Sequence, residues 1–252
     1  MMGFATRSLL LGATMVALAT LLSACTILPA YIEFESRTGG SFDSASGGVS
    51  TDRMQTVGMD RTGGEPNAAL SERQIRILRA ADEIGRTQNF VVSGYRYSYD
   101  CTGTILAIYA MAGVHVVDLF PRYSGNGVAR LYAIARDYDL LYDTVYPAPG
   151  DLIFWDNTYD RAGDKRWNDE LTHVGMVISV DSNGQIEYLH HHYTQGVVVA
   201  RMNLRDPETH LGPGGIVVNS PMRMRSHRYI NPDQWLASHL YRRMGALHRI
   251  PM

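Results

Sequence analysis

The chain has 252 residues, a formal net charge of −2 and two cysteines. So small a net charge argues against the broad basic surface of a nucleic-acid-binding protein, and no nucleic-acid partner is expected. The roughly 180 residues that follow a polar N-terminal region suit a single globular domain.

The N-terminus has the pattern of an export signal. Arg7 precedes an apolar run over 8–22, which is too short for a membrane-spanning helix and ends in Leu-Ser-Ala-Cys at 22–25. Small residues directly before a cysteine resemble the lipobox of bacterial lipoproteins, in which the signal peptide is removed and the cysteine is acylated. The resemblance implies a signal peptide over 1–24 and a lipid anchor on Cys25. An ordinary secretory signal or a membrane anchor is the alternative.

Residues 25–70 are rich in Gly, Ser, Thr and Asp and contain few large apolar side chains. A segment of this composition cannot bury enough surface to offset its ordering entropy, so a flexible tether is predicted. Thr26 stands where an aspartate retains some lipoproteins at the inner membrane. The domain is therefore expected to face the periplasm from the outer membrane.

Helices are predicted to precede the strands. Ser71 and Gln74 have the spacing of a capping box, which predicts a helix beginning there. Asp100 is the predicted N-cap of a second helix that ends near Gly113. A weaker helical pattern covers 127–144.

Strands dominate the second half of the chain. The Asn-Gly pair at 183–184 predicts a hairpin, because such turns match the twist of antiparallel strands. Helices followed by antiparallel strands indicate an α+β fold, with the N-terminal helices packed on the sheet. Apolar residues from Trp235 to Leu247 have nearly helical spacing and predict an extra C-terminal helix. The predicted strands are 152–155, 174–180, 186–192 and 196–202.

Cys101 and His173 are the candidate nucleophile and base. Cys101 falls in the first turn of the second helix, where free backbone N–H groups and the helix dipole favour a thiolate. If lipidation uses Cys25, Cys101 is an unpaired thiol in an exported protein, which indicates a reactive role. The alternative is that Cys101 serves only as a small buried hydrophobic residue. In the chemical hypothesis Cys101 attacks a carbonyl carbon, and His173 holds the thiolate and then protonates the leaving amine.

A third polar residue is predicted on the hairpin. His190 and His192 share one face of their strand, and pairing across the turn brings that face toward His173. His190 is expected to orient the His173 imidazole, with His192 as the runner-up. His191 points to the opposite face. A metal-binding tract is the alternative for this triple histidine, but no metal and no cofactor is expected.

Three motifs resemble the NlpC/P60 and CHAP branches of the papain-like peptidoglycan hydrolases. They are Asp-Cys-Thr-Gly at 100–103, Pro-Gly-Asp-Leu-Ile-Phe at 149–154 and His-Val-Gly-Met-Val at 173–177. The resemblance implies a papain-like catalytic domain over 71–205, with Cys101, His173 and His190 as its catalytic residues. Residues 206–252 are expected to form an extension that packs on this domain.

The chain departs from the family pattern in one respect that affects chemistry. NlpC/P60 domains have a tyrosine after the first helix that helps line the oxyanion site, and 85–90 lacks one. Tyr95 and Tyr97 are the candidates to replace it. Asp100 and Asp151 are not assigned catalytic roles, because a helix cap and a turn explain them better.

The expected function is hydrolysis of amide bonds in peptidoglycan stem peptides by a membrane-tethered cysteine peptidase or amidase. Endopeptidase cleavage suits the NlpC/P60 resemblance, and cleavage at N-acetylmuramoyl-L-alanine suits the CHAP resemblance. The alternatives are a catalytically silent lipoprotein that binds the cell wall or an envelope protein partner, and a papain-like acyltransferase acting on lipids.

Overall fold

The structure is a computed structural model that describes residues 69–251. The predicted signal peptide, the lipidation of Cys25 and all of the predicted tether before residue 69 lie outside the described residues and stay predictions. Within 69–251, no helix combines the length and the apolar character that a bilayer span requires.

Three helices precede most of the sheet, and capping side chains fix where each begins. Ser71 caps α1 (Glu72–Thr87) in the predicted capping box, since its Oγ accepts from the Gln74 N–H at 3.3 Å and Gln74 Oε1 accepts from the Ser71 N–H at 3.0 Å. Asp100 caps α2 (Cys101–Met111), as predicted. Asn126 caps α3 (Gly127–Asp137), which ends earlier than the predicted 127–144.

The sheet has six strands in the order β3-β8-β4-β5-β6-β7, and each neighbouring pair is antiparallel. The four predicted strands are therefore confirmed, together with the hairpin between β5 and β6. A separate two-stranded ribbon, β1-β2, lies before α2. The strand bounds are β1 Val91–Val92, β2 Tyr95–Arg96, β3 Leu141–Tyr142, β4 Leu152–Trp155, β5 His173–Val180, β6 Gln185–His192, β7 Gly196–Asn203 and β8 Tyr241–Gly245.

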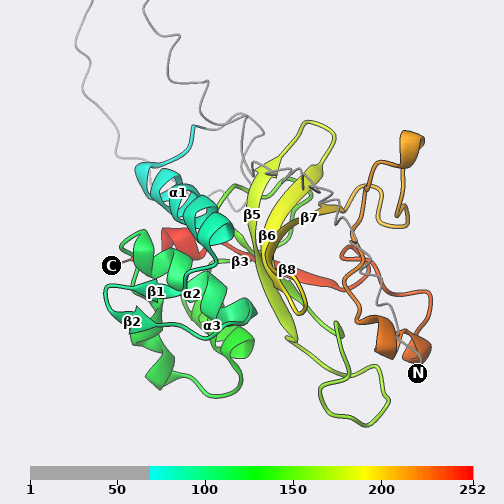
Figure 1. Cartoon of the computed structure of the whole chain (residues 1–252), viewed down its shortest axis with the longest axis horizontal. Helices are drawn as coiled ribbons and strands as arrows, with labels where there is room; N and C mark the ends of the chain where they lie inside the picture. Colours follow the sequence, from blue (N-terminus) through cyan, green and yellow to red (C-terminus); the bar gives the residue numbers. More distant parts are fainter. Residues whose placement is uncertain (1–68, 252) are drawn as a thin grey trace, which may run out of the picture.

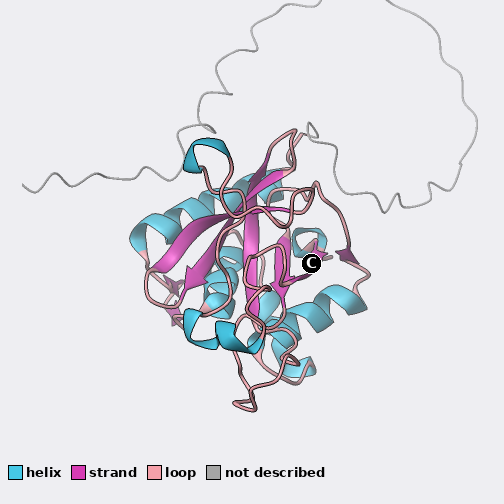
Figure 2. Ribbon diagram, turned by 90° about the vertical axis from the view of Figure 1, so that its right-hand side faces the viewer, coloured by secondary structure: helices cyan, strands magenta, loops and turns pink. Residues whose placement is uncertain are grey.

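The sheet lies between the helices and the segment that links β7 to β8. In Figure 1 the helices cover one side of the sheet, and the segment between β7 and β8 lies on the other. Figure 2 shows the same layers turned by 90°. One buried cluster joins the helices to one face of the sheet, and a second joins Ala237, Leu240 and Met244 to the opposite face. This is the α+β arrangement predicted; the finer papain-like arrangement stays a prediction.

The predicted C-terminal helix is wrong. Residues 241–245 form β8, which inserts between β3 and β4 in the sheet, and the residues before it form turns. Leu240 packs on the sheet without a helix, whereas the Trp235 ring contacts His210 and Arg228. Burial against a sheet face and pairing with two strands outweigh the weak helical spacing of this segment. Short 3-10 helices occupy Val116–Arg122, Pro213–Gly215, Arg225–Ile230 and Leu247–Arg249.

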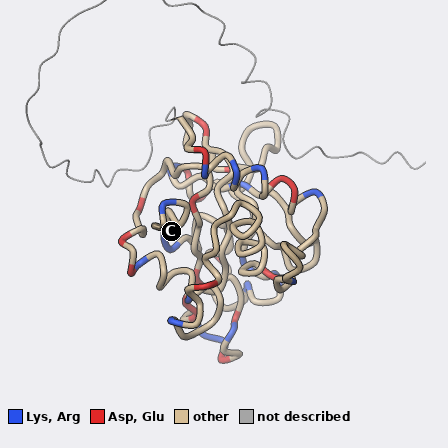
Figure 3. The backbone as a smooth tube through the Cα atoms, turned by 90° about the vertical axis from the view of Figure 1, so that its left-hand side faces the viewer, with Lys and Arg blue, Asp and Glu red and all other residues tan. Residues whose placement is uncertain are grey.

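Charged residues of both signs are spread over the described domain. On the side shown in Figure 3, acidic and basic positions are interspersed along the backbone. This distribution agrees with the near-zero net charge of the sequence.

Candidate active site

Cys101 is the first residue of α2, and the chain before it packs closely against the helix. The Asp100 carboxylate accepts from the Gly103 N–H at 2.7 Å, which fixes the helix start. A Cβ atom on Gly103 would lie 1.9 Å from the Ser98 carbonyl oxygen. The glycine of the Asp-Cys-Thr-Gly motif is therefore required because the backbone that leads into the nucleophile lies directly on the helix.

We expect Gly103→Ala to destabilise the fold by about 1–3 kcal/mol or more, since overpacking forces the backbone near Ser98 to move. Urea unfolding measures the effect. Met111→Ala, at an exposed position in the last turn of the same helix, is the control, with an expected change within about 0.5 kcal/mol. Equal unfolding midpoints for the two variants would contradict this account.

His173 and His190 are in direct contact. The antiparallel register pairs Gly175 with His190, and His173 Nε2 lies 2.9 Å from His190 Nδ1. The rings are nearly perpendicular, with centroids 5.1 Å apart. Because Nε2 is engaged, the other ring nitrogen of His173, Nδ1, remains for a reacting partner.

The other two histidines of the run have different surroundings. His192 Nδ1 accepts a hydrogen bond from the Thr194 N–H at 3.3 Å, and the His192 ring centroid lies 6.2 Å from that of His190. His191 points to the helix side, where its ring contacts Tyr99 at 4.5 Å between centroids. No group of His, Cys, Asp or Glu side chains within the described part of the chain is arranged to hold a metal ion.

Cys101 lies beside β5 at the end where His173 stands. The backbone N–H of Val174, the residue after His173, interacts with the Cys101 sulfur. The negative charge of Asp100 acts on both groups, because it adds to the burial that raises the pKa of Cys101 and opposes the burial that lowers the pKa of His173. The thiol and the imidazole therefore lie within the field of the same carboxylate.

The expectation of a thiolate at the helix start is wrong for this structure. Burial, followed by the charge of Asp100, raises the pKa of Cys101 to about 11, although hydrogen bonds from Val174 and Thr102 oppose the shift. Burial, followed by the charges of His191 and His192, lowers the pKa of His173 to about 4. Desolvation thus outweighs the helix dipole, and the resting pair is a neutral thiol and a neutral imidazole.

The buried histidines predict a loss of stability in acid. Because the pKa of His173 is lower in the folded than in the unfolded chain, its contribution is fully present above about pH 6.5 and is lost as the pH falls toward 4. The expected loss is on the order of 3 kcal/mol, and His190, whose pKa is also lowered by burial, adds to it in the same direction. Urea unfolding at pH 7 and pH 4.5 measures it. His190→Gln should flatten this dependence, and an unchanged pH profile in that variant would refute the assignment.

Asp151 is a structural residue, as predicted. It is fully buried, its Oδ2 accepts from the Ala148 N–H at 2.7 Å and from the Tyr142 hydroxyl, and its Oδ1 lies 3.3 Å from His248 Nδ1. Trp155 is also fully buried and its ring contacts His173, with 5.8 Å between centroids. It therefore supports the imidazole from within the core.

Tyr159 is a residue near the site that sequence reasoning missed. It lies in the loop of residues 156–172 that links β4 to β5. Burial raises the pKa of its hydroxyl, and the loop that carries it ends directly before His173. Tyr95 is exposed and its ring contacts Tyr97 at 4.7 Å between centroids. No spacing in the sequence distinguishes Tyr159, because its position depends on how the loop folds.

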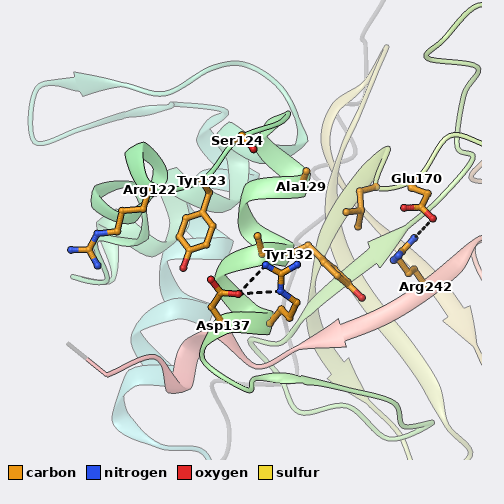
Figure 4. A pocket seen from close by; sticks show the side chains of 11 residues that line it. Arg122, Tyr123, Ser124, Ala129, Tyr132, Asp137, Glu170 and Arg242 are labelled. Carbon is orange, nitrogen blue, oxygen red and sulfur yellow. Dashed lines mark hydrogen bonds and ion pairs between the residues drawn. The ribbon is translucent and has the colours of Figure 1, made fainter.

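Two hollows lie side by side along α3. The larger, about 540 Å³, is bordered by α3, the segment before it, and residues of the 156–172 loop and β8 (Figure 4). The smaller, about 390 Å³, shares Ala129, Glu170 and Leu171 with it. Asn126 joins the two walls, since its Nδ2 donates to the Leu171 carbonyl at 3.3 Å. We call these adjoining hollows the α3 groove.

Residues 91–192 match the family model described as the CHAP domain. This segment of the chain is therefore similar to CHAP domains, which is consistent with the predicted resemblance to CHAP and NlpC/P60 hydrolases. The match runs from β1 to the end of β6 and includes Cys101, His173 and His190. A CHAP domain indicates hydrolase activity on peptidoglycan in general, often dependent on a cysteine. No curated protein and no solved structure matches the chain.

Proposed function

We propose that this protein is a cysteine hydrolase that cleaves amide bonds in peptidoglycan stem peptides. Cys101 is the nucleophile, His173 the base and His190 the residue that orients His173. The single observation that carries the proposal is the contact of 2.9 Å between His173 Nε2 and His190 Nδ1, which leaves His173 Nδ1 for a thiol. The CHAP match over the same residues supports the substrate class.

The neutral resting pair defines how the first step proceeds. As the Cys101 sulfur attacks the carbonyl carbon, its proton passes to His173 Nδ1, and His190 accepts from the Nε2–H of the resulting imidazolium. The imidazolium then gives the proton to the leaving amine, the C–N bond breaks and a thioester remains. Water attacks the thioester, and His173 transfers one water proton to the departing sulfur, which restores the thiol.

The proposed location is the periplasmic side of the outer membrane. A lipid anchor on Cys25 and the tether over 25–70 would keep the domain close to the cell wall. The support is the lipobox-like sequence before Cys25 and the absence of aspartate at Thr26. Metabolic labelling with a radioactive fatty acid tests the anchor, since a Cys25→Ala variant should lose the label.

Digestion of purified sacculi tests the activity. The wild-type protein should release soluble fragments, and mass spectrometry should identify the new amine and carboxyl ends. Ends within the stem peptide indicate an endopeptidase, whereas a free lactyl group on the muramic acid indicates an amidase. No release of fragments under any condition would refute the proposal.

The second candidate is a catalytically silent domain that binds the cell wall. The observation that favours it is the protonated state of Cys101, whose pKa burial raises to about 11. Cosedimentation with sacculi separates the two candidates, because a silent domain binds sacculi without releasing fragments.

A further inference from the structure

The loop of residues 156–172 ends directly before His173 and forms one wall of the α3 groove. Glu170 and Leu171 border both hollows of the groove. At the two ends of the loop, Asn157 and Leu171 have φ angles of 53° and 52°, in the left-handed region. Such backbone conformations cost on the order of 1–3 kcal/mol each in a non-glycine residue and persist only where surrounding contacts hold them.

Arg223, from the extension after β7, supplies contacts inside this loop. Its side chain is almost fully buried, with 2% of the residue exposed. The guanidinium donates to the Asn157 carbonyl, and its Cζ lies 4.7 Å from the centre of the Trp167 ring. One end of the loop and its middle are thereby attached to the same buried cation.

Backbone contacts attach the residues on either side of Tyr159 to the extension. The Met224 N–H donates to the Thr158 carbonyl at 2.8 Å, and the Asp160 N–H donates to His227 Nδ1 at 3.0 Å. Tyr159 is therefore held between two fixed neighbours. The other end of the loop lies near the nucleophile. Asn126 donates to the Leu171 carbonyl at 3.3 Å, and a Cβ atom on the next residue, Gly127, would lie 2.5 Å from the Thr102 side chain.

Arg242, in β8, joins the two ends of the loop to each other and to α3. Its Nη1 lies 2.8 Å from Asp156 Oδ2 and 3.5 Å from Glu170 Oε1. Its Cζ lies 5.1 Å from the centre of the Tyr132 ring on α3. Figure 4 shows Arg242 and Glu170 paired at the edge of the groove. The arginine therefore spans both walls.

We propose that Arg223 and Arg242 are positioning residues that hold the 156–172 loop as a wall of the α3 groove and against the start of α3, which packs on the residue after Cys101. The extension, which lies outside the CHAP match, thereby takes part in placing the substrate. This inference rests on the proposed function for its substrate, but the contact of the loop with the start of α3 does not depend on it.

Arg242→Gln is the test variant, because Arg242 is less buried than Arg223 and its loss is less damaging to the core. Arg243→Gln is the matched control: it removes the same charge from the neighbouring position of β8, where Arg243 pairs with the exposed Asp143 at 3.2 Å. Two quantities are measured: kcat/KM for release of fragments from sacculi, and the rate of Cys101 alkylation by iodoacetamide at pH 8 in chains that carry Cys25→Ala.

For Arg242→Gln we expect kcat/KM to fall about 10-fold through a higher KM, because the groove wall is no longer fixed. Alkylation should become roughly threefold faster or more, since a loosened loop exposes the thiol to water and lowers its pKa. Arg243→Gln should match the parent chain in both measurements. Arg242→Lys, which keeps the positive charge but not the planar guanidinium, should recover part of each change.

Equal alkylation rates for Arg242→Gln and Arg243→Gln would overturn the inference, whatever their thermal stabilities. A merely structural role of Arg242 would lower stability without changing the alkylation rate of the folded protein at pH 8. The alkylation measurement needs no peptidoglycan, so its failure is distinguishable from failure of the proposed function, which the release of fragments by the wild-type protein decides.

Discussion

Replacing Cys101 with alanine should lower the release of fragments from sacculi by at least about 10³-fold while the domain stays folded. The reason is that the proposed reaction passes through a thioester on this sulfur, and alanine offers no nucleophile. The Cys101 side chain is small, so its loss leaves a minor cavity. Mass spectrometry of the released fragments measures activity, and thermal unfolding measures the fold.

Cys25→Ala is the matched control for the loss of a thiol, because the chain has just these two cysteines. Purified and added to sacculi in solution, this variant should retain activity, since the anchor is not needed when substrate is supplied. Undiminished release by the Cys101→Ala protein would exclude the thiol mechanism and leave the binding hypothesis.

Alkylation of Cys101 at pH 7 should be about 300-fold slower than alkylation of a free cysteine peptide. With a pKa of about 11, the thiolate is about 10⁻⁴ of the total at this pH, compared with about 3% for an ordinary thiol. Because the folded-state pKa is raised, the thiolate fraction grows about tenfold for each pH unit between 7 and 10. Iodoacetamide labelling of the Cys25→Ala protein, followed by mass spectrometry, gives the rate at each pH.

Comparing Cys101 with the free cysteine peptide decides whether the helix dipole or burial controls the pKa of the thiol. A helix start acting alone would lower the pKa and make Cys101 react faster than the free peptide at pH 7. Burial acting alone produces the slow, steeply pH-dependent reaction. A rate at or above that of the peptide would show that the dipole prevails in solution.

A low thiolate fraction is compatible with catalysis when the base is adjacent. His173, with its pKa lowered to about 4, is neutral over the whole physiological range and is therefore able to accept the thiol proton during attack. The activity per folded molecule should accordingly persist down to about pH 5, where an ordinary histidine is protonated. Activity is divided by the folded fraction at each pH, because the protein loses stability in acid.

Local signals were sufficient to predict the elements that carry the site. The capping residues Ser71 and Asp100 mark helix starts, and both caps are present in the structure. The Asn183-Gly184 turn predicts the hairpin that brings His190 to His173, and period-two alternation selects His190 over His191. These signals are readable because caps, turns and alternation depend on residues only a few positions apart.

Three features depend on contacts that no local pattern encodes. The extension holds the loop that leads into His173. The helical spacing near Leu240 yields to pairing of the following residues in the sheet, and desolvation raises the thiol pKa that the helix start alone would lower. Local patterns are enough to predict the order of the elements, the face of each histidine and the resemblance of residues 91–192 to CHAP domains. The protonation state of the pair and the role of the residues after β7 follow from the tertiary structure, because burial and pairing between distant segments exist only once the chain has folded.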